Sequence, residues 1–311
     1  MFQLAHFSDP HIAPLPKARP SQLANKRFLG WLSWKRRRQR VHRREILDAL
    51  AADLQAQAPD HVVVTGDITN IALPEEFRQA SAWLGALGAA DWISVVPGNH
   101  DAYVALPWAQ GLGAWADYMS GDGAPAGSPA AEGAAEAGQG AFPFLRRRGP
   151  LAIVGLSTAL PTPPGSAAGA LGSGQLERLA ASLDALGREG LFRCVLLHHP
   201  PQDNGISRRK RLVDAEGFRA VLREVGAELV LHGHDHSFND ARLPGPRGPV
   251  PVFGVPSASA SLGQRRPGAH YQIYGIERAD TAWRIRVLTR GLGPDGAGFV
   301  EAARRSVEVT A

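Results

Sequence analysis

Five short polar motifs, spread from residue 9 to residue 236, constrain this 311-residue chain more than any other feature. Each motif holds carboxylate, imidazole or amide groups, which are the ligands expected for divalent Mn, Fe, Co or Zn. No single motif is decisive, but their joint occurrence in one chain predicts a metal site. In order, they are Asp9-Pro10-His11, Gly66-Asp67, Gly98-Asn99-His100-Asp101, His198-His199-Pro200 and Gly233-His234-Asp235-His236.

A short apolar run that is typical of a buried strand precedes each of the five motifs. Because sites in α/β sheets form at the carboxyl ends of the strands, we expect the motifs to meet at that edge. Predicted helices alternate with the strands, which favours a layered α/β fold. The predicted strands are 2–8, 62–65, 92–96, 151–156, 193–197, 228–231, 250–255, 271–276 and 283–288, and the predicted helices are 40–57, 75–87, 174–187 and 215–225, whereas residues 291–311 carry no clear pattern.

The composition is that of a globular protein, with 44% hydrophobic and 20% charged residues. We find no internal repeat and no domain break, and we predict one domain over residues 1–311 with a flexible, Gly- and Ala-rich insertion at about 121–140. The single cysteine, Cys194, allows no internal disulfide and fits a reducing compartment. No apolar run approaches the ~20 residues of a membrane-spanning helix. Because the first residues also lack the features of a signal peptide, we expect a cytoplasmic protein.

Two adjacent metal ions, about 3.5–4 Å apart, can clamp a phosphate group between them, and one ligand must then bridge the ions. Asp67 is the best candidate for the bridge, because a carboxylate has two oxygens and this one follows a central predicted strand. The motifs therefore predict a metal-dependent hydrolase of phosphate esters.

The series Asp-x-His, Gly-Asp, Gly-Asn-His-Asp, His-His-Pro and Gly-His-x-His resembles the calcineurin-like metallophosphoesterase superfamily over residues 2–236. The resemblance implies a four-layer α/β/β/α sandwich and two divalent transition-metal ions, with Mn expected first and Fe, Zn or Co as alternatives. It also implies in-line attack on phosphorus by a hydroxide that bridges the two metals. One metal would be held by Asp9, His11 and His236 and the other by Asn99, His198 and His234, with Asp67 between them.

The resemblance further implies roles for residues beside the metals. His100 would stabilise the phosphoryl oxygens or protonate the leaving group, and Asp101 would orient His100. In the His198-His199 pair the family pattern places the ligand first, so His199 is a candidate for contact with the substrate.

Positive charge is concentrated near the N-terminus. Residues 1–50 carry eleven Lys and Arg against three acids, a charge of +8, whereas the whole chain carries +5. An insertion at about 14–40 mixes Trp and Phe with arginine, which is typical of an amphipathic helix at a membrane surface. Such a helix could overhang the metals, and Arg36, Arg37 and Arg38 could then bind lipid headgroups or substrate phosphates.

A plainer alternative remains open for the same insertion: Trp31 and Trp34 pack on the protein and the arginines are only solvated. Nucleic acid is the least favoured partner, because the rest of the chain is net acidic and offers no further basic track. The oligomeric state is not predicted.

Three functions compete. The first is a phosphodiesterase, because Gly66-Asp67-Ile68-Thr69-Asn70 and the Gly-Asn-His-Asp motif look most like those of bacterial cyclic-nucleotide and glycerophosphodiester phosphodiesterases. The second is a pyrophosphatase that cleaves UDP-2,3-diacylglucosamine during lipid A synthesis, on the inner face of the membrane, because the insertion resembles the basic, Trp-rich segment of such enzymes. The third is a non-catalytic metal-binding scaffold, which the complete ligand set disfavours.

Overall fold

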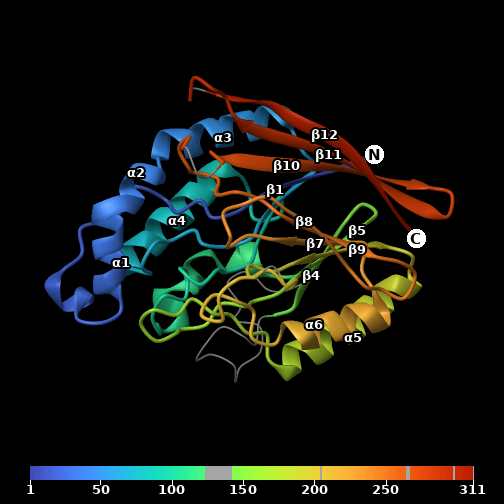
Figure 1. Ribbon diagram of the computed structural model, residues 1–311, viewed down its shortest axis with the longest axis horizontal. Helices are drawn as coiled ribbons and strands as arrows, with labels where there is room; N and C mark the ends of the chain where they lie inside the picture. The colour runs from blue at the N-terminus through green and yellow to red at the C-terminus, as the bar shows by residue number, and fades with distance from the viewer. Residues whose placement is uncertain (123–141, 204, 264–266, 297, 311) are drawn as a thin grey trace.

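The computed structural model describes residues 1–122, 142–203, 205–263, 267–296 and 298–310. Two six-stranded sheets pack face to face, and helices cover the outer face of each, which gives the four-layer α/β/β/α sandwich that the resemblance implied (Figure 1). From edge to edge, the first sheet contains β12 (Phe299–Thr310), β11 (Ala282–Leu292), β10 (His270–Ala279), β1 (Phe2–Phe7), β2 (His61–Val64) and β3 (Ile93–Val95). The second sheet contains β4 (Phe144–Arg148), β5 (Leu151–Gly155), β6 (Phe192–Leu196), β7 (Leu229–His232), β9 (Val250–Gly254) and β8 (Asn239–Leu243).

The central strands of both sheets are parallel. In the first sheet β1, β2 and β3 run in parallel, and in the second β5, β6, β7 and β9 do. Their carboxyl ends therefore open on one edge, and the loops that leave them carry all five motifs. The long β10–β11–β12 meander is antiparallel and extends the first sheet away from this edge.

The helices of the outer layers show the apolar spacing that predicted them. In α3 (Arg44–Gln57) the buried side chains are Ile46, Leu47, Leu50 and Leu54, which fall on one face. The remaining outer helices are α4 (Pro74–Leu87), α5 (Ser173–Arg188) and α6 (Ala215–Val225), and short helical turns occur at Pro20–Leu23, Trp108–Gln110 and Leu112–Met119. None of the described helices is long and apolar enough to cross a membrane.

Two hydrophobic clusters explain why the central strands are mainly apolar on both faces. Along β6, Cys194 and Leu196 join the cluster that reaches the first sheet, α3 and α4. The alternate residues Val195 and Leu197 join the cluster beneath α5 and α6. Successive side chains of a strand point to opposite faces, so a strand that is covered on both faces needs a continuous apolar run.

The structure corrects the sequence interpretation at three strands. The residues of β4, β8 and β12 were not predicted, and the stretch 291–311, which carries no clear pattern, contains the end of β11 and all of β12. Most of the predicted insertion at 121–140 lies outside the described residues.

The basic insertion at about 14–40 is folded onto the protein rather than forming one regular helix. It contains α1 (Arg27–Ser33), a π-helical turn (Trp34–Arg38) and α2 (Gln39–Val41), which directly precede α3 in the chain (Figure 1). Its inward-facing residues include Arg27, Gly30, Trp34 and Arg38, at helical spacing. Trp34 is buried, as the plainer alternative held, whereas Lys35, Arg36 and Arg37 are exposed.

The buried Arg27 fixes this insertion to the loop that carries Asp67. Its Nε donates to the Ile71 carbonyl at 3.0 Å and its Nη2 to the Ala72 carbonyl at 2.5 Å. A buried cation needs such partners, because desolvation is otherwise costly. The insertion is therefore packed against the loops that carry the motifs.

Candidate metal centre

All five motifs lie in loops that directly follow strands. Asp9 and His11 follow β1, Asp67 follows β2, and Asn99 to Asp101 follow β3. The two His-rich motifs follow β6 and β7 of the other sheet. The site therefore lies between the sheets at their shared edge, and its aspartates, Asn99 and the pair His198 and His199 are buried.

The backbone of these loops turns the side chains inward. Non-glycine residues seldom adopt positive φ, and such strain is often held at functional sites. Here the loops are held together by backbone hydrogen bonds, from Asp9 N to Gly66 O and from His11 N to Asp67 O, both at 3.0 Å. The positive φ angles at the site are 53° at Asp9, 39° at His11, 55° at Asp67, 73° at His234 and 52° at His236.

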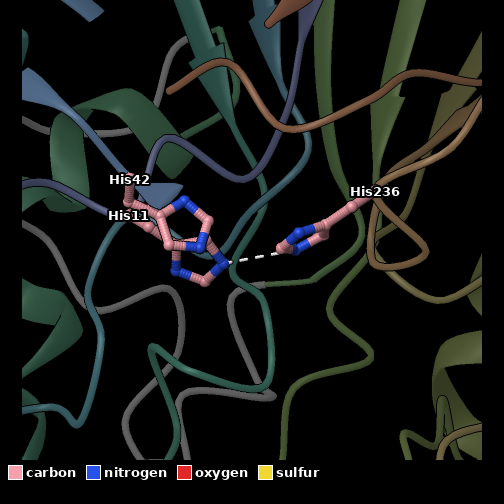
Figure 2. A group of neighbouring side chains, drawn as sticks. All are labelled: His11, His42 and His236. Carbon is pink, nitrogen blue, oxygen red and sulfur yellow. Dashed lines mark hydrogen bonds between the residues drawn. The ribbon is translucent and has the colours of Figure 1, made fainter. Parts of the chain in front are cut away.

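A first group of ligand atoms converges around Asp9, His11, Asp67 and His236. Nε2 of His236 lies 3.1 Å from Oδ1 of Asp9 and 3.3 Å from Nε2 of His11. Figure 2 shows the rings of His11 and His236 pointing toward each other. Ligands about 2.0–2.2 Å from one ion lie ~3–3.5 Å apart, so these separations suit a shared metal. Oδ1 of Asp9 is buried and accepts no hydrogen bond from the described residues.

A second group contains Asn99, His198 and His234. Nε2 of His198 lies 3.2 Å from Oδ1 of Asn99 and 3.3 Å from Nδ1 of His234. Asp67 connects the two groups, because its Oδ2 lies 3.5 Å from Nε2 of His198 and 3.8 Å from Nε2 of His11. One carboxylate oxygen thus faces both sets of imidazoles, as a bridging ligand would.

Hydrogen bonds at the far side of the rings set the tautomers of two histidines. Nδ1 of His198 donates to the Thr65 carbonyl at 2.6 Å, and Nδ1 of His11 donates to the Thr69 carbonyl at 3.1 Å. Each bond leaves the Nε2 lone pair directed into the site. This is the usual arrangement around metal-binding histidines.

The charges of the site also suit a cation. Burial holds the pKa of His11 well below its ordinary value and lowers that of His234 to about 3, so both are neutral and can donate lone pairs. Burial would raise the pKa of Asp67, but His198 and His100 hold it well below the ordinary range. Despite burial, Asp67 in turn raises the pKa of His198 to about 10, so a metal bound here would displace a proton from Nε2 of this residue.

His100 and Asp101 make different contacts from those that the resemblance implied. The His100 ring is fixed by Nδ1, which donates to the Asn70 carbonyl at 2.5 Å, and not by Asp101. Asp101 instead accepts hydrogen bonds from the backbone of Thr69 at 2.8 Å and of Gly98 at 2.9 Å. Asp101 therefore shapes the loop, and its influence on the His100 ring is indirect.

Of the three predicted arginines, the structure brings only Arg38 to the centre. Its Nη2 lies 2.9 and 3.0 Å from the two ring nitrogens of His11, and its Nη1 lies 3.2 and 3.4 Å from those of His100. An atom in the ring plane and this close to both nitrogens would collide with the carbon between them. The guanidinium therefore lies over the ring faces as a cation–π contact, and the in-plane lone pair of His11 Nε2 stays open.

His199 is placed differently from a substrate contact. It is fully buried, and both ring nitrogens are engaged, Nδ1 with Oγ1 of Thr158 at 2.7 Å and Nε2 with the Ala167 carbonyl at 3.1 Å. Its ring centroid lies 4.4 Å from that of His234. His199 thus packs against His234, and both of its ring nitrogens bond within the protein.

Two residues near the centre were missed in the sequence. Tyr103 stacks on His100, with ring centroids 5.3 Å apart, and Nζ of Lys26 lies 4.5 Å from the centroid of the phenol ring. His42, just after α2, packs against His11 with centroids 4.5 Å apart. Neither belongs to a metal-binding motif, so only the folded chain places them here.

The four-layer fold and this cluster of buried aspartates and histidines define a metal-dependent hydrolase of phosphate esters. The sequence matches the family model of the calcineurin-like phosphoesterases over residues 2–238, and the chain belongs to that family. The family uses dinuclear metal centres. No curated protein matched the sequence.

Two solved structures share the fold at low sequence identity. A dimetal phosphatase from Danio rerio superposes with a TM-score of 0.59 at 14% identity, over 96% of this chain and 98% of that one. The purple acid phosphatase PPD1 from yellow lupin superposes with a TM-score of 0.56 at 11% identity, over 99% of this chain and 53% of that one.

Proposed function

We propose that this protein is a phosphodiesterase that works with two divalent transition-metal ions. The observation that carries the proposal is the position of Asp67, whose Oδ2 faces His11 on one side and His198 on the other. One ion would be held by Asp9, His11 and His236, the other by Asn99, His198 and His234, with Asp67 shared. When bound, the ions supply an activated water nucleophile and Lewis-acid stabilisation of the phosphoryl oxygens.

Arg38 would bind the phosphate of the substrate. It is a cation at the centre, and no carboxylate of the described residues lies within ion-pair distance of it. Arginine presents its donors in a planar fork that matches phosphate oxygens. Arg36 and Arg37 are exposed on the outer side of the same helix, so the proposal assigns them no contact with the reacting phosphate.

His100 would protonate the leaving group. Because its Nδ1 proton is held by the Asn70 carbonyl, the ring can donate only from Nε2, and only as an imidazolium. Burial and Arg38 lower the pKa of His100 to about 4. A bound phosphodiester brings a negative charge beside the ring, which favours the protonated form.

The test is hydrolysis of bis-p-nitrophenyl phosphate and p-nitrophenyl phosphate by protein loaded with Mn²⁺, Fe²⁺, Zn²⁺ or Co²⁺. We expect faster turnover of the diester, and a loss of at least ~10³-fold in Asp67→Ala and Asn99→Ala. Glu177→Gln, at an exposed helix position, is the control and keeps full activity. Full activity in the Asp67→Ala protein would overturn the proposal, and a metal-loaded protein that turns over no phosphodiester would instead indicate a non-catalytic metal-binding scaffold.

A second candidate has a specific observation in its favour. Phe28 and Leu29 of α1 are 48% and 51% exposed, and the exposed Lys35, Arg36 and Arg37 follow one to two turns later. Exposed apolar groups beside basic ones suit the surface of an anionic membrane. The same segment carries Arg38 into the centre. It could therefore bring a lipid diphosphate such as UDP-2,3-diacylglucosamine from the inner face of the membrane to the metal centre.

Flotation with phosphatidylglycerol vesicles and a UMP-release assay separate the two candidates. If the lipid is the substrate, Phe28→Ser/Leu29→Ser and Arg36→Glu/Arg37→Glu should each lose vesicle binding and UMP release while keeping hydrolysis of the soluble diester. Val213→Ser, at an apolar residue that is 67% exposed elsewhere, should bind as the unmodified protein does. Equal vesicle binding by all variants would remove the lipid candidate.

A further inference from the structure

His42 lies at the centre, although none of the five metal-binding motifs includes it. It directly follows α2, is 3% exposed, and stacks on the buried Trp34 with ring centroids 6.3 Å apart. Its centroid lies 4.5 Å from that of His11 and 5.7 Å from that of His236 (Figure 2). It therefore packs against two histidines that the proposed function assigns to the same metal.

Two serine hydroxyls engage Nδ1 of His42. Nδ1 lies 3.0 Å from Oγ of Ser259 and 3.4 Å from Oγ of Ser257. The Ser257 hydroxyl donates its own proton to the Asp9 carbonyl at 2.7 Å, so toward His42 it can only accept. A neutral imidazole that donates its Nδ1 proton to these hydroxyls carries a lone pair on Nε2.

Nε2 of His42 has no hydrogen-bond partner within the part of the chain that the structure describes. His199 offers the contrast, because both of its nitrogens are engaged. One nitrogen each from His11, His42 and His236 lies within 4.8 Å of the others.

We propose that His42 is a third imidazole ligand of the metal that is held by Asp9, His11 and His236. The assignment rests on the proposed dinuclear centre and adds to its donor set. Imidazole suits Zn and Fe better than Mn, whereas carboxylate oxygens suit Mn. With three nitrogen ligands, this site should prefer Zn²⁺ or Fe²⁺ over Mn²⁺. The preference should be stronger than at the site of Asn99, His198 and His234.

The experiment is calorimetric titration of metal-free protein with Zn²⁺ and with Mn²⁺, together with the visible spectrum of the Co²⁺-loaded protein. His42→Phe keeps the ring that packs on Trp34 and His11 but has no nitrogen. His42→Asn keeps a donor toward Ser259 and loses the lone pair at Nε2. We expect Zn²⁺ affinity at one of two sites to fall at least ~10-fold in both variants, with a smaller change for Mn²⁺ and an altered Co²⁺ spectrum.

His270→Phe is the control and should bind both ions unchanged, because this half-buried histidine of β10 packs on Phe238 and not on a proposed metal ligand. Two sites of unmodified affinity and an unchanged Co²⁺ spectrum in the His42→Phe protein would overturn the role of His42 and leave the proposed centre intact. Failure of the unmodified protein to take up any ion would instead overturn the proposed dinuclear centre, and the assignment of His42 with it.

Discussion

The guanidinium of Arg38 lies across the face of His100, with Nη1 3.2 Å from one ring nitrogen and 3.4 Å from the other. One partner comes from the basic insertion and the other from the Gly-Asn-His-Asp motif. Arg38 is held there because Gly30 and Trp34 fix the same side of the helical segment against the protein. The insertion is therefore part of the wall of the active centre.

Replacement of Arg38 should weaken both binding and turnover of a phosphodiester. Arg38→Ala removes a cation next to the reacting phosphate, and we expect kcat/KM to fall by ~10²–10³-fold. Arg38→Lys keeps the charge but loses the planar fork and should recover only part of the rate. Steady-state kinetics on bis-p-nitrophenyl phosphate at fixed ionic strength measures both effects.

Arg37→Ala is the matched control, because it removes the same charge from an exposed position one residue away. Its kcat/KM should stay within about two-fold of the unmodified value, since exposed charges interact weakly through water. Equal losses of kcat/KM in the Arg37→Ala and Arg38→Ala proteins would show that the net positive charge of the insertion, and not a contact at the centre, causes the loss.

Gly30 should tolerate no side chain, although glycine is a poor residue for a helix. A Cβ on Gly30 would lie 2.5 Å from Cγ2 of Ile71 and 2.8 Å from the hydroxyl of Tyr103. Gly30→Ala should therefore cost ~1–3 kcal/mol of unfolding free energy and, by lifting α1, lower the hydrolysis rate. Denaturant unfolding and the diesterase assay on one preparation measure both.

Gly85→Ala is the helix control. Nothing lies within 4 Å of its added Cβ, and the position is exposed in α4. The same substitution there should stabilise the protein by about 0.5–1 kcal/mol. If Gly30→Ala stabilised the protein as Gly85→Ala does, this result would refute the close packing of α1 against Tyr103.

Whether a strand could be predicted from the sequence depended on its place in the sheet. Strands such as β6 and β7 were predictable because both faces are buried and the apolar run is continuous. The missed β4, β8 and β12 are all edge strands. Edge strands carry charged residues that discourage pairing with other chains, so the Arg- and Glu-rich β12 shows no apolar pattern in the sequence.

A similar limit applies to the centre. The five motifs could be placed together because each ends a strand of a parallel sheet. His42 has no such signal, since it reaches His11 only through the packing of Trp34 and Ser259 around it. The sequence could have distinguished Arg38 from Arg36 and Arg37. Arg38 continues the helical spacing of Arg27, Gly30 and Trp34.

The core histidine of β2 should make the protein acid-sensitive independently of the metals. His61 is fully buried, and burial, followed by Arg148 and Arg146, lowers its pKa to about 3, against 6.5 when unfolded. Between these values the unfolded chain binds more protons, so stability is present above pH 6.5 and is lost as the pH falls toward 3. From pH 7 to pH 5 this residue should remove ~2 kcal/mol.

His61→Val isolates that contribution, because valine suits a buried strand and does not titrate. Denaturant unfolding of chelator-treated protein at pH 7 and pH 5 should show a smaller loss in the variant, by ~2 kcal/mol. The chelator matters, because the histidines of the centre would otherwise release metal over the same pH range. Parallel losses in the two proteins would mean that His61 takes up its proton in the folded state as readily as in the unfolded chain.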